Sequence, residues 1–442
     1  MLLFLLFQIQ EVEEHIETEF ISEVDKIQKP LFNINDSLYK NSKFDMIIRI
    51  YRNTDEERKK FILAEAYYYK RQYQKANELY NQILKSSSDS EIVLFSNISR
   101  SWILYHQGLY NLAIEQETKD SLLLTLCYIK MKDYSLAYSI SKNYSSDTFL
   151  FLSGFSAYLL KSYDLAINSF EKLIQNYPNS SFTAIGIYRI GIIYLRTEFY
   201  DRAIKYFTLI VNNYKQFKFY QNAIYLSAYS YYKLQNYEKS YEYALMLIKN
   251  YPNDENTKLA KNLIKEIYLA RPEIVDSTTE YYDYLKAYKL YKEDKCYSAI
   301  EVYKVFINSK EKRVLFFFKT TIGDAFLNDA TLEIGECYMK VQNYKEAVNS
   351  FRRCKLDECS YKLGISLYLD KNYSQSIIHF EKLLKNKNFI SKIPEIYYYL
   401  GLNYLAMNKR KKAEEYLNKS KMLYIEMGDS EKVKTIESIL NN

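Results

Sequence analysis

NYPNSSFTAIGIYRIGIIYLRTEFYDRAIKYFTLIV, at Asn176–Val211, is one of three near-copies of a single unit within residues 147–254. The copies align on a small residue near the middle of their second half, which we call the anchor. The three anchors follow one another in steps of 37 residues. They are Ala166, Ala203 and Ser240.

Each copy repeats the same side-chain types at fixed distances from its anchor. A second small residue lies twelve residues before the anchor, a tyrosine three before it, and in two copies a phenylalanine four after it. These residues are Gly154, Gly191 and Ala228, then Tyr163, Tyr200 and Tyr237, then Phe170 and Phe207. Apolar residues recur at helical spacing, so each unit is expected to form two amphipathic helices that cross closely at the small residues. One such hairpin cannot bury its apolar faces alone, so neighbouring hairpins must stack.

This pattern resembles the tetratricopeptide repeat, in which small and aromatic residues occupy these positions and proline ends the second helix. Pro178 and Pro252, in Asn-Tyr-Pro-Asn linkers, and the phrase at Asp329–Phe351 carry the same resemblance. The linkers and the 37-residue step look like the branch of periplasmic tetratricopeptide proteins in bacterial envelopes. The barrel-assembly lipoprotein and the Tol–Pal-associated coordinator belong to that branch. The resemblance implies an all-α solenoid of about ten helix hairpins in a right-handed superhelix, several of them degenerate.

The anchor recurs along most of the chain at unequal spacing. The full series is Ile47, Ala76, Ala113, Ala137, Ala166, Ala203, Ser240, Ala299, Ala347, Ser376 and Ala413. The steps of 24 and 29 residues on either side of Ala137 are too short for two full-length helices. Helices shorter than those of a regular repeat are therefore expected there.

The long step after the third central copy predicts a boundary between two repeat arrays. We place a seam at residues 271–278, between a first array at 31–270 and a second array at 279–442 that ends in a capping helix. Residues 1–30 are expected to hold an N-terminal helix. Within it, the apolar run Met1–Phe7 is interpreted as a whole or truncated secretory signal, and the alternative is an apolar tip on that helix.

Charge and hydropathy argue against two classes of partner. The net charge of +7, from 61 basic and 54 acidic residues, is mild and dispersed, whereas a nucleic-acid binder carries a concentrated basic stripe. The one dense run, Lys409–Lys412, is interpreted as a solvated helix face. No segment approaches the roughly 20 apolar residues that span a bilayer, so any membrane association would pass through a partner.

No catalytic, metal-binding or cofactor-binding constellation is recognised. The three histidines, His15, His106 and His379, are far apart in sequence and have no metal-spaced neighbours. Phosphate-binding loops and the zinc-protease motif are absent from the sequence. The chain is therefore not expected to be an enzyme or to need a cofactor.

The five cysteines show no zinc-binding or thioredoxin-like spacing. Cys337 and Cys354 fall at inward-facing repeat positions and are expected to be small buried hydrophobic residues. A Cys354–Cys359 disulfide is the disfavoured alternative. A further apolar run, Val314–Phe318, lies outside the repeat pattern and is expected to form an elongated helix packed into the groove of the repeats, the alternative being an exposed patch for a partner.

The resemblance also implies a partner-binding groove lined by the first helix of each hairpin. The aromatic residues that match groove positions are Phe151, Phe155, Tyr158, Tyr188, Tyr225, Tyr229, Tyr232, Tyr361, Tyr368 and Tyr398. The alternative is that these side chains pack on a neighbouring hairpin. The lysine and asparagine clamp of chaperone-binding relatives is not matched, because aromatic or leucine residues occupy one of its key positions.

The leading hypothesis is a non-enzymatic scaffold that holds an extended or helical segment of a partner protein or peptide. The resemblance implies a role in assembling cell-envelope proteins, in the periplasm or elsewhere outside the cytoplasm. Two alternatives stay open. One is an intracellular, cytoplasmic adaptor, and the other is a regulatory subunit of an enzyme complex whose catalytic residues lie in another chain.

Overall fold

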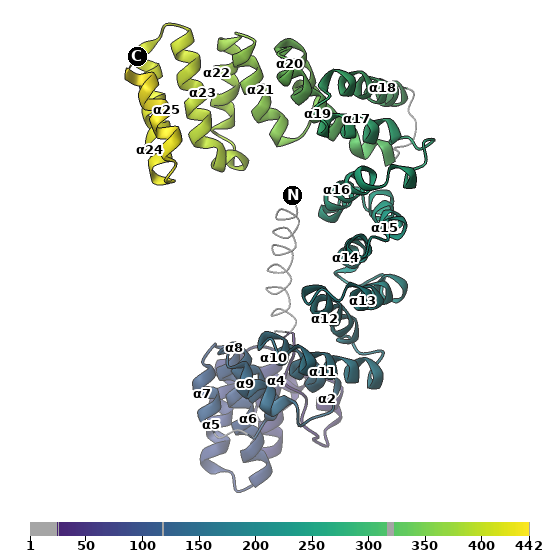
Figure 1. The fold of residues 1–442 in the computed structure, drawn as a ribbon. Coiled ribbons are helices and arrows are strands. Elements are labelled where there is room, and N and C mark those ends of the chain that lie inside the picture. Colours follow the sequence, from purple (N-terminus) through teal and green to yellow (C-terminus); the bar gives the residue numbers. More distant parts are fainter. Residues whose placement is uncertain (1–23, 25, 117–118, 316–321, 442) are drawn as a thin grey trace. The chain divides into compact units, whose positions relative to one another are not determined.

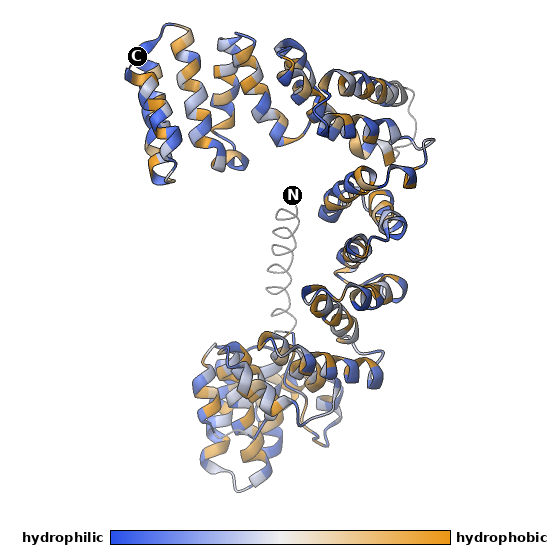
Figure 2. Cartoon of the chain, in the orientation of Figure 1, coloured by the Kyte–Doolittle hydropathy of each residue, from blue (hydrophilic) through white to orange (hydrophobic). Residues whose placement is uncertain are grey.

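The computed structural model describes residues 24, 26–116, 119–315 and 322–441, with the side chains of 311–315 left out. These residues contain 24 α-helices and three short 3-10 helices, and no strand occurs among them (Figure 1). The predicted all-α fold of stacked repeats is confirmed. In Figure 2 the helices carry both apolar and polar residues, as the amphipathic pattern requires. The predictions for Met1–Phe7 and for the packing of Val314–Phe318 fall outside the described residues.

The chain divides into two compact units, an N-terminal unit up to Phe217 and a C-terminal unit from Lys218. The helices of the N-terminal unit are α2 (Ser37–Lys40), α3 (Phe44–Tyr51), α4 (Glu57–Tyr69), α5 (Tyr73–Ser86), α6 (Ser90–His106), α7 (Tyr110–Glu115), α8 (Ser121–Lys130), α9 (Tyr134–Ser141), α10 (Asp147–Leu159), α11 (Tyr163–Asn176), α12 (Thr183–Arg196) and α13 (Tyr200–Asn213). Consecutive helices pair as hairpins, and first helices also contact each other, as α4 contacts α6 and α6 contacts α8.

The C-terminal unit is built in the same way. Its helices are α14 (Tyr220–Lys233), α15 (Tyr237–Asn250), α16 (Glu255–Ala270), η1 (Pro272–Ile274), α17 (Tyr282–Lys292), α18 (Cys296–Leu315), η2 (Ile322–Phe326), α19 (Leu327–Lys340), α20 (Tyr344–Arg353), α21 (Asp357–Leu369), α22 (Tyr373–Leu383), η3 (Lys387–Lys392), α23 (Ile393–Ala406), α24 (Arg410–Glu426) and α25 (Ser430–Asn441). Helix α25 packs on α24 at the end of the described chain. The predicted seam at residues 271–278 contains η1, and the division into two arrays there stays a prediction.

The turn inside each hairpin has one backbone conformation in a fixed register with the anchor. All eleven anchors are fully buried. Five residues before each anchor, φ is positive, between 54° and 62° at the non-glycine positions and 78° at the single glycine. These residues are Ser42, Arg71, Gly108, Lys132, Lys161, Glu198, Gln235, Asp294, Gln342, Lys371 and Asn408. The anchor spacing read from the sequence therefore locates eleven helix turns to the residue.

Replacing Lys161 by glycine is expected to raise the free energy of unfolding by about 0.5–1 kcal/mol. A side chain in the left-handed region strains the backbone, and glycine removes that strain at a small cost in unfolded-chain entropy. The matched control is Lys172→Gly in the middle of α11, which should lower the free energy of unfolding by about 1 kcal/mol. Urea unfolding followed by the fluorescence of the single tryptophan, Trp102, measures both. Equal losses in the two variants would contradict the assignment of strain to the turn.

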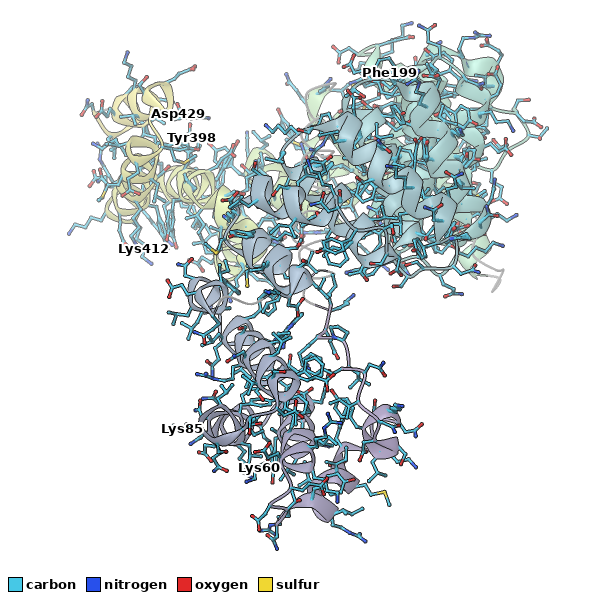
Figure 3. All side chains as sticks on the ribbon, turned by 90° about the horizontal axis from the view of Figure 1, so that it is seen from below. Lys60, Lys85, Phe199, Tyr398, Lys412 and Asp429 are labelled. Carbon is cyan, nitrogen blue, oxygen red and sulfur yellow. A yellow bond between two sulfur atoms is a disulfide. The ribbon has the colours of Figure 1, made fainter. Side chains whose placement is uncertain are left out.

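The short helices expected around Ala137 are confirmed. Helices α7, α8 and α9 have 6, 10 and 8 residues, whereas α11, α12 and α13 have 14 each. The exposed run Lys409–Lys412 leads into and begins α24, as predicted for a solvated helix face, and Lys412 is labelled in Figure 3.

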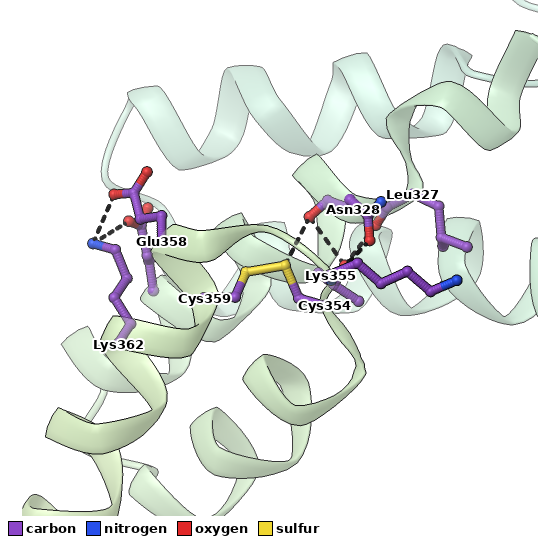
Figure 4. The surroundings of a disulfide bond; sticks show 9 residues. Leu327, Asn328, Cys354, Lys355, Glu358, Cys359 and Lys362 are labelled. Carbon is purple, nitrogen blue, oxygen red and sulfur yellow. Dashed lines mark hydrogen bonds and ion pairs between the residues drawn. A yellow bond between two sulfur atoms is a disulfide. The ribbon is translucent and has the colours of Figure 1, made fainter. Parts of the chain in front are cut away.

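The expectation that Cys354 and Cys359 stay unpaired is wrong, because the structure joins them in a disulfide (Figure 4). Cys354 directly follows α20 and Cys359 lies in the first turn of α21. The short connection brings their Cα atoms to 6.0 Å, a separation that a disulfide spans. Among the described residues the other three cysteines are free and buried.

Each unit contains a buried carboxylate that is bound by a lysine and by tyrosine hydroxyls. In the C-terminal unit, Lys265 of α16 lies 2.9 Å from a carboxylate oxygen of Glu333 in α19, which also accepts hydrogen bonds from Tyr284 and Tyr303. This network links α16 to α19 although the α17–α18 hairpin separates them in sequence. The equivalent buried carboxylate in the N-terminal unit lies behind the candidate site and is described with it below.

Candidate binding site

The four predicted groove residues of the N-terminal unit are buried. Phe151, Phe155, Tyr158 and Tyr188 are at most 3% exposed. Phe151 stacks on Phe182 of the next hairpin at 4.4 Å between ring centroids. In this structure these rings fill the space between hairpins, and partner binding by them stays a prediction.

The six predicted groove residues of the C-terminal unit differ in exposure. Tyr225, Tyr229 and Tyr361 are buried. The partly exposed members are Tyr232, Tyr368 and Tyr398, the last of which is labelled in Figure 3. Partner binding stays a prediction for these residues as well. The three partly exposed tyrosines are more accessible to a partner than the three buried ones.

A recurring pair of tyrosines marks the turn edge of five hairpins. The first tyrosine lies eight residues before the anchor, near the end of the first helix, and the second lies three before it, at the start of the second helix. The pairs are Tyr68–Tyr73, Tyr105–Tyr110, Tyr158–Tyr163, Tyr232–Tyr237 and Tyr368–Tyr373, with ring centroids 5.5 to 6.2 Å apart. The second ring of every pair is partly exposed.

Sequence reasoning missed the first two pairs, although the signal was present. The predicted groove residues belong to other repeats and include none from the repeats anchored at Ala76 and Ala113. Counting eight residues back from those anchors gives Tyr68 and Tyr105 directly.

These two pairs enclose a cavity of about 410 Å³ in the N-terminal unit, which we call the tyrosine pocket. Its wall comes from the ends of α4, α6 and α8 and the starts of α5 and α7. The lining residues are Gln28, Tyr68, Tyr69, Arg71, Tyr73, Tyr105, His106, Tyr110 and Lys130. Ligand pockets in proteins have volumes of about 300–1,000 Å³, so the pocket can hold a peptide side chain or a small molecule.

His106 holds the aromatic wall in place. Its Nε2 atom lies 2.9 Å from the Tyr68 hydroxyl, and its ring is stacked on Tyr73 with centroids 5.5 Å apart. Burial of the imidazole among these rings lowers the pKa of His106, and the nearby Arg71 guanidinium lowers it further. The imidazole is therefore neutral at pH 7 in this structure.

Behind the wall, a buried ion pair fixes Lys29, which precedes the first hairpin, against α4. Lys29 Nζ lies 2.7 Å from Glu65 Oε2, and both side chains are at most 1% exposed. Glu65 also accepts hydrogen bonds from Tyr39, Tyr80 and Ser99, at 2.8, 2.6 and 2.5 Å. The Lys29 ammonium lies 5.0 Å from the ring centroid of Tyr68. The back of the tyrosine pocket is thus held by a fully paired buried carboxylate.

The pocket is aromatic with cationic groups at its rim. Arg71 is exposed in the left-handed turn between α4 and α5, and Lys130 ends α8. Among the described residues that line the pocket, none is an aspartate or a glutamate. Burial and then the Glu65 charge raise the pKa of Tyr68, which keeps its hydroxyl protonated.

A family model described as the tetratricopeptide repeat matches residues 60–90, 149–180 and 222–254. The first match contains Tyr68 and Tyr73 of the tyrosine pocket. The chain contains tetratricopeptide repeats. Proteins built from this repeat are generally non-catalytic scaffolds that bind peptides and other proteins.

Solved structures of three tetratricopeptide proteins are similar to this chain at low identity. One is pilF of Pseudomonas aeruginosa, at 14% identity and a TM-score of 0.34, covering 50% of this chain and 99% of that one. The second is from the APC/C hetero-tetramer Cut9–Hcn1, at 14% and 0.28, covering 86% and 89%. The third is the TPR2AB domain of yeast Sti1 in its pHSP90 complex, at 13% and 0.25, covering 69% and 98%. None of the curated protein sequences compared with the chain matches it.

Among the described residues, no helix is both long enough and apolar enough to cross a membrane.

Proposed function

We propose that this tetratricopeptide protein is a scaffold that holds a segment of a partner protein along its tyrosine pairs. The observation that carries the proposal is the recurrence of a partly exposed tyrosine pair at the same repeat positions in both units. If the second tyrosine of each pair served only to pack within its hairpin, its ring would not need to be exposed to solvent. Tyrosine is enriched at binding interfaces because its ring buries a large apolar area and its hydroxyl forms a hydrogen bond.

We further propose that the protein works in the cell envelope, in assembling or positioning envelope proteins. Two features support this location. The Asn-Tyr-Pro-Asn linkers resemble those of the periplasmic branch, and the Cys354–Cys359 disulfide is typical of oxidising compartments. An intracellular adaptor would keep both thiols reduced.

Site-specific photo-crosslinking in the cells that make the protein tests the scaffold. A photoreactive phenylalanine analogue at Tyr73 and, separately, at Tyr232 is expected to crosslink the same partner proteins reproducibly. The matched control positions are Leu165 in the N-terminal unit and Ile378 in the C-terminal unit, which are exposed on second helices. Partners captured only from the control positions would overturn the proposal and move the binding surface to the second helices.

Differential thiol labelling of intact cells tests the location. The expected result is that Cys354 and Cys359 resist alkylation until a reductant is added, while the buried Cys127 reacts after unfolding without reductant. Finding Cys354 and Cys359 reduced in fresh cells would contradict the envelope location and leave the scaffold proposal intact.

A further inference from the structure

We propose that the tyrosine pocket binds a carboxylate of the partner segment, together with the aromatic or apolar side chain next to it. The inference rests on the proposed function, because the partner protein supplies the carboxylate. It deepens that function by assigning one anchoring contact, in the N-terminal unit, to a defined chemical group.

The first argument is the shape and chemistry of the wall. Tyr68, Tyr73, Tyr105 and Tyr110 present ring faces and edges around a cavity of about 410 Å³. An apolar or aromatic side chain entering it would contact rings on several sides, and aromatic pairs stabilise binding beyond the burial of their area. The ion pair of Lys29 with Glu65 fixes the back of this wall, so the cavity is formed before a ligand arrives.

The second argument is the charge at the rim. Arg71 carries a guanidinium whose parallel N–H groups match the two oxygens of a carboxylate. Its charge reaches into the pocket. After burial, it is the second cause that lowers the pKa of His106, and it opposes the rise that burial gives the pKa of Tyr73. Lys130 adds a second positive charge on the lining.

The third argument is that nearby acidic groups already have partners. After burial, the charges of Glu65 and Asp120 both contribute to the raised pKa of Tyr68. Glu65 pairs with Lys29, and Asp120 accepts a hydrogen bond from Trp102 Nε1 at 2.8 Å. Since the described lining residues include Arg71 and Lys130 and no acidic side chain, they favour an anion over a cation.

The test is a titration of the full chain with short peptides, monitored through the NMR signals of its histidine rings. Three histidines occur in the chain, and the His106→Gln variant identifies the signal of the pocket. The probe is a capped tetrapeptide with glutamate next to phenylalanine, compared with the same peptide carrying glutamine. A third peptide with glutamine and a free terminal carboxylate distinguishes a side-chain source of the carboxylate from a chain-end source.

The expected result is that a carboxylate peptide binds at least about 10-fold more tightly than the neutral peptide and raises the pKa of His106, as a nearby anion does. Arg71→Gln should lose that preference. Lys161→Gln, at the same turn position three hairpins further along the N-terminal unit, should keep it.

Three results of the peptide titrations would overturn the inference. They are equal binding of the glutamate and glutamine peptides, an unchanged preference in a folded Arg71→Gln variant, and no binding of any peptide up to about 10 mM. Tighter binding of inorganic phosphate than of the carboxylate peptides would also overturn it. Each of these failures leaves crosslinking from Tyr73 and Tyr232 intact, so it is distinguishable from failure of the scaffold proposal.

Discussion

Replacing Lys29 by methionine is expected to lower the free energy of unfolding of the N-terminal unit by about 3–5 kcal/mol. The change removes the only cation within hydrogen-bond distance of Glu65 among the described residues and leaves that carboxylate buried without a counter-charge. The three hydroxyls that also bind Glu65 are dipoles and offset only part of this cost. Urea unfolding followed by Trp102 fluorescence measures the change, because this single tryptophan is buried in the N-terminal unit.

A second substitution separates the loss of charge balance from the loss of packing. In the Lys29→Met/Glu65→Gln variant the buried charge is gone, while the glutamine carbonyl can still accept from Tyr39 or Tyr80. This double variant should recover at least about 2 kcal/mol of the loss. Lys40→Met, at an exposed position of α2, is the control and should change stability by less than about 0.5 kcal/mol. A double variant no more stable than Lys29→Met would contradict the electrostatic explanation.

The second large effect is expected at Gly191, where α12 crosses α13. A Cβ atom added at Gly191 would lie 2.7 Å from the Phe207 ring, closer than real side chains approach. The helices would have to separate, and such overpacking costs about 1–3 kcal/mol. Gly191→Ala should therefore lower the free energy of unfolding by about 1–2 kcal/mol, after alanine's better helix propensity is counted.

Gly186 on the same helix provides a matched control. A Cβ atom there would meet Leu173 and Phe170 at 3.4 Å, which small side-chain movements accommodate. Gly186→Ala is expected to be neutral or to stabilise the unit by up to about 1 kcal/mol, because alanine favours helix. Equal destabilisation by the two variants in the same urea titration would show that contact with Phe207 does not decide the effect.

The fold could be predicted from the sequence because two helices that cross closely require small residues at the crossing, and these recur at regular spacing. At four crossings a phenylalanine ring covers the partner helix and the residue beneath it is glycine, namely Gly154, Gly191, Gly335 and Gly364. The buried anchor on the other helix is small for the same reason. Turn positions then follow by counting, since the left-handed residue always lies five before the anchor.

Only part of the candidate site could be predicted from the sequence. Helical periodicity shows that Phe151 and Tyr188 face inward, but it cannot show whether the next hairpin covers them. The structure shows that Phe182 and Phe217 pack on these rings and bury them. The tyrosine pocket depends on Lys29, which lies outside the repeats and reaches Glu65 across 36 residues of sequence.

The disulfide between Cys354 and Cys359 shows a different limit of sequence reasoning. A spacing of five residues within one helix places two side chains on different faces, and such cysteines do not meet. Here a short non-helical connection between α20 and α21 turns the chain between them. The exact end of α20, which the repeat pattern does not fix, decides whether the bond can form.

We propose above that partners bind at the turn edges that carry the tyrosine pairs. Hydrogen–deuterium exchange of the full chain, with and without a partner captured by crosslinking, tests this most directly. Exchange is expected to slow at residues 68–73 and 105–110, around the tyrosine pocket, when the partner is bound. Protection confined to α7, α9 and α11, where Leu112, Leu136 and Leu165 are exposed, with no change at the turn edges, would contradict it.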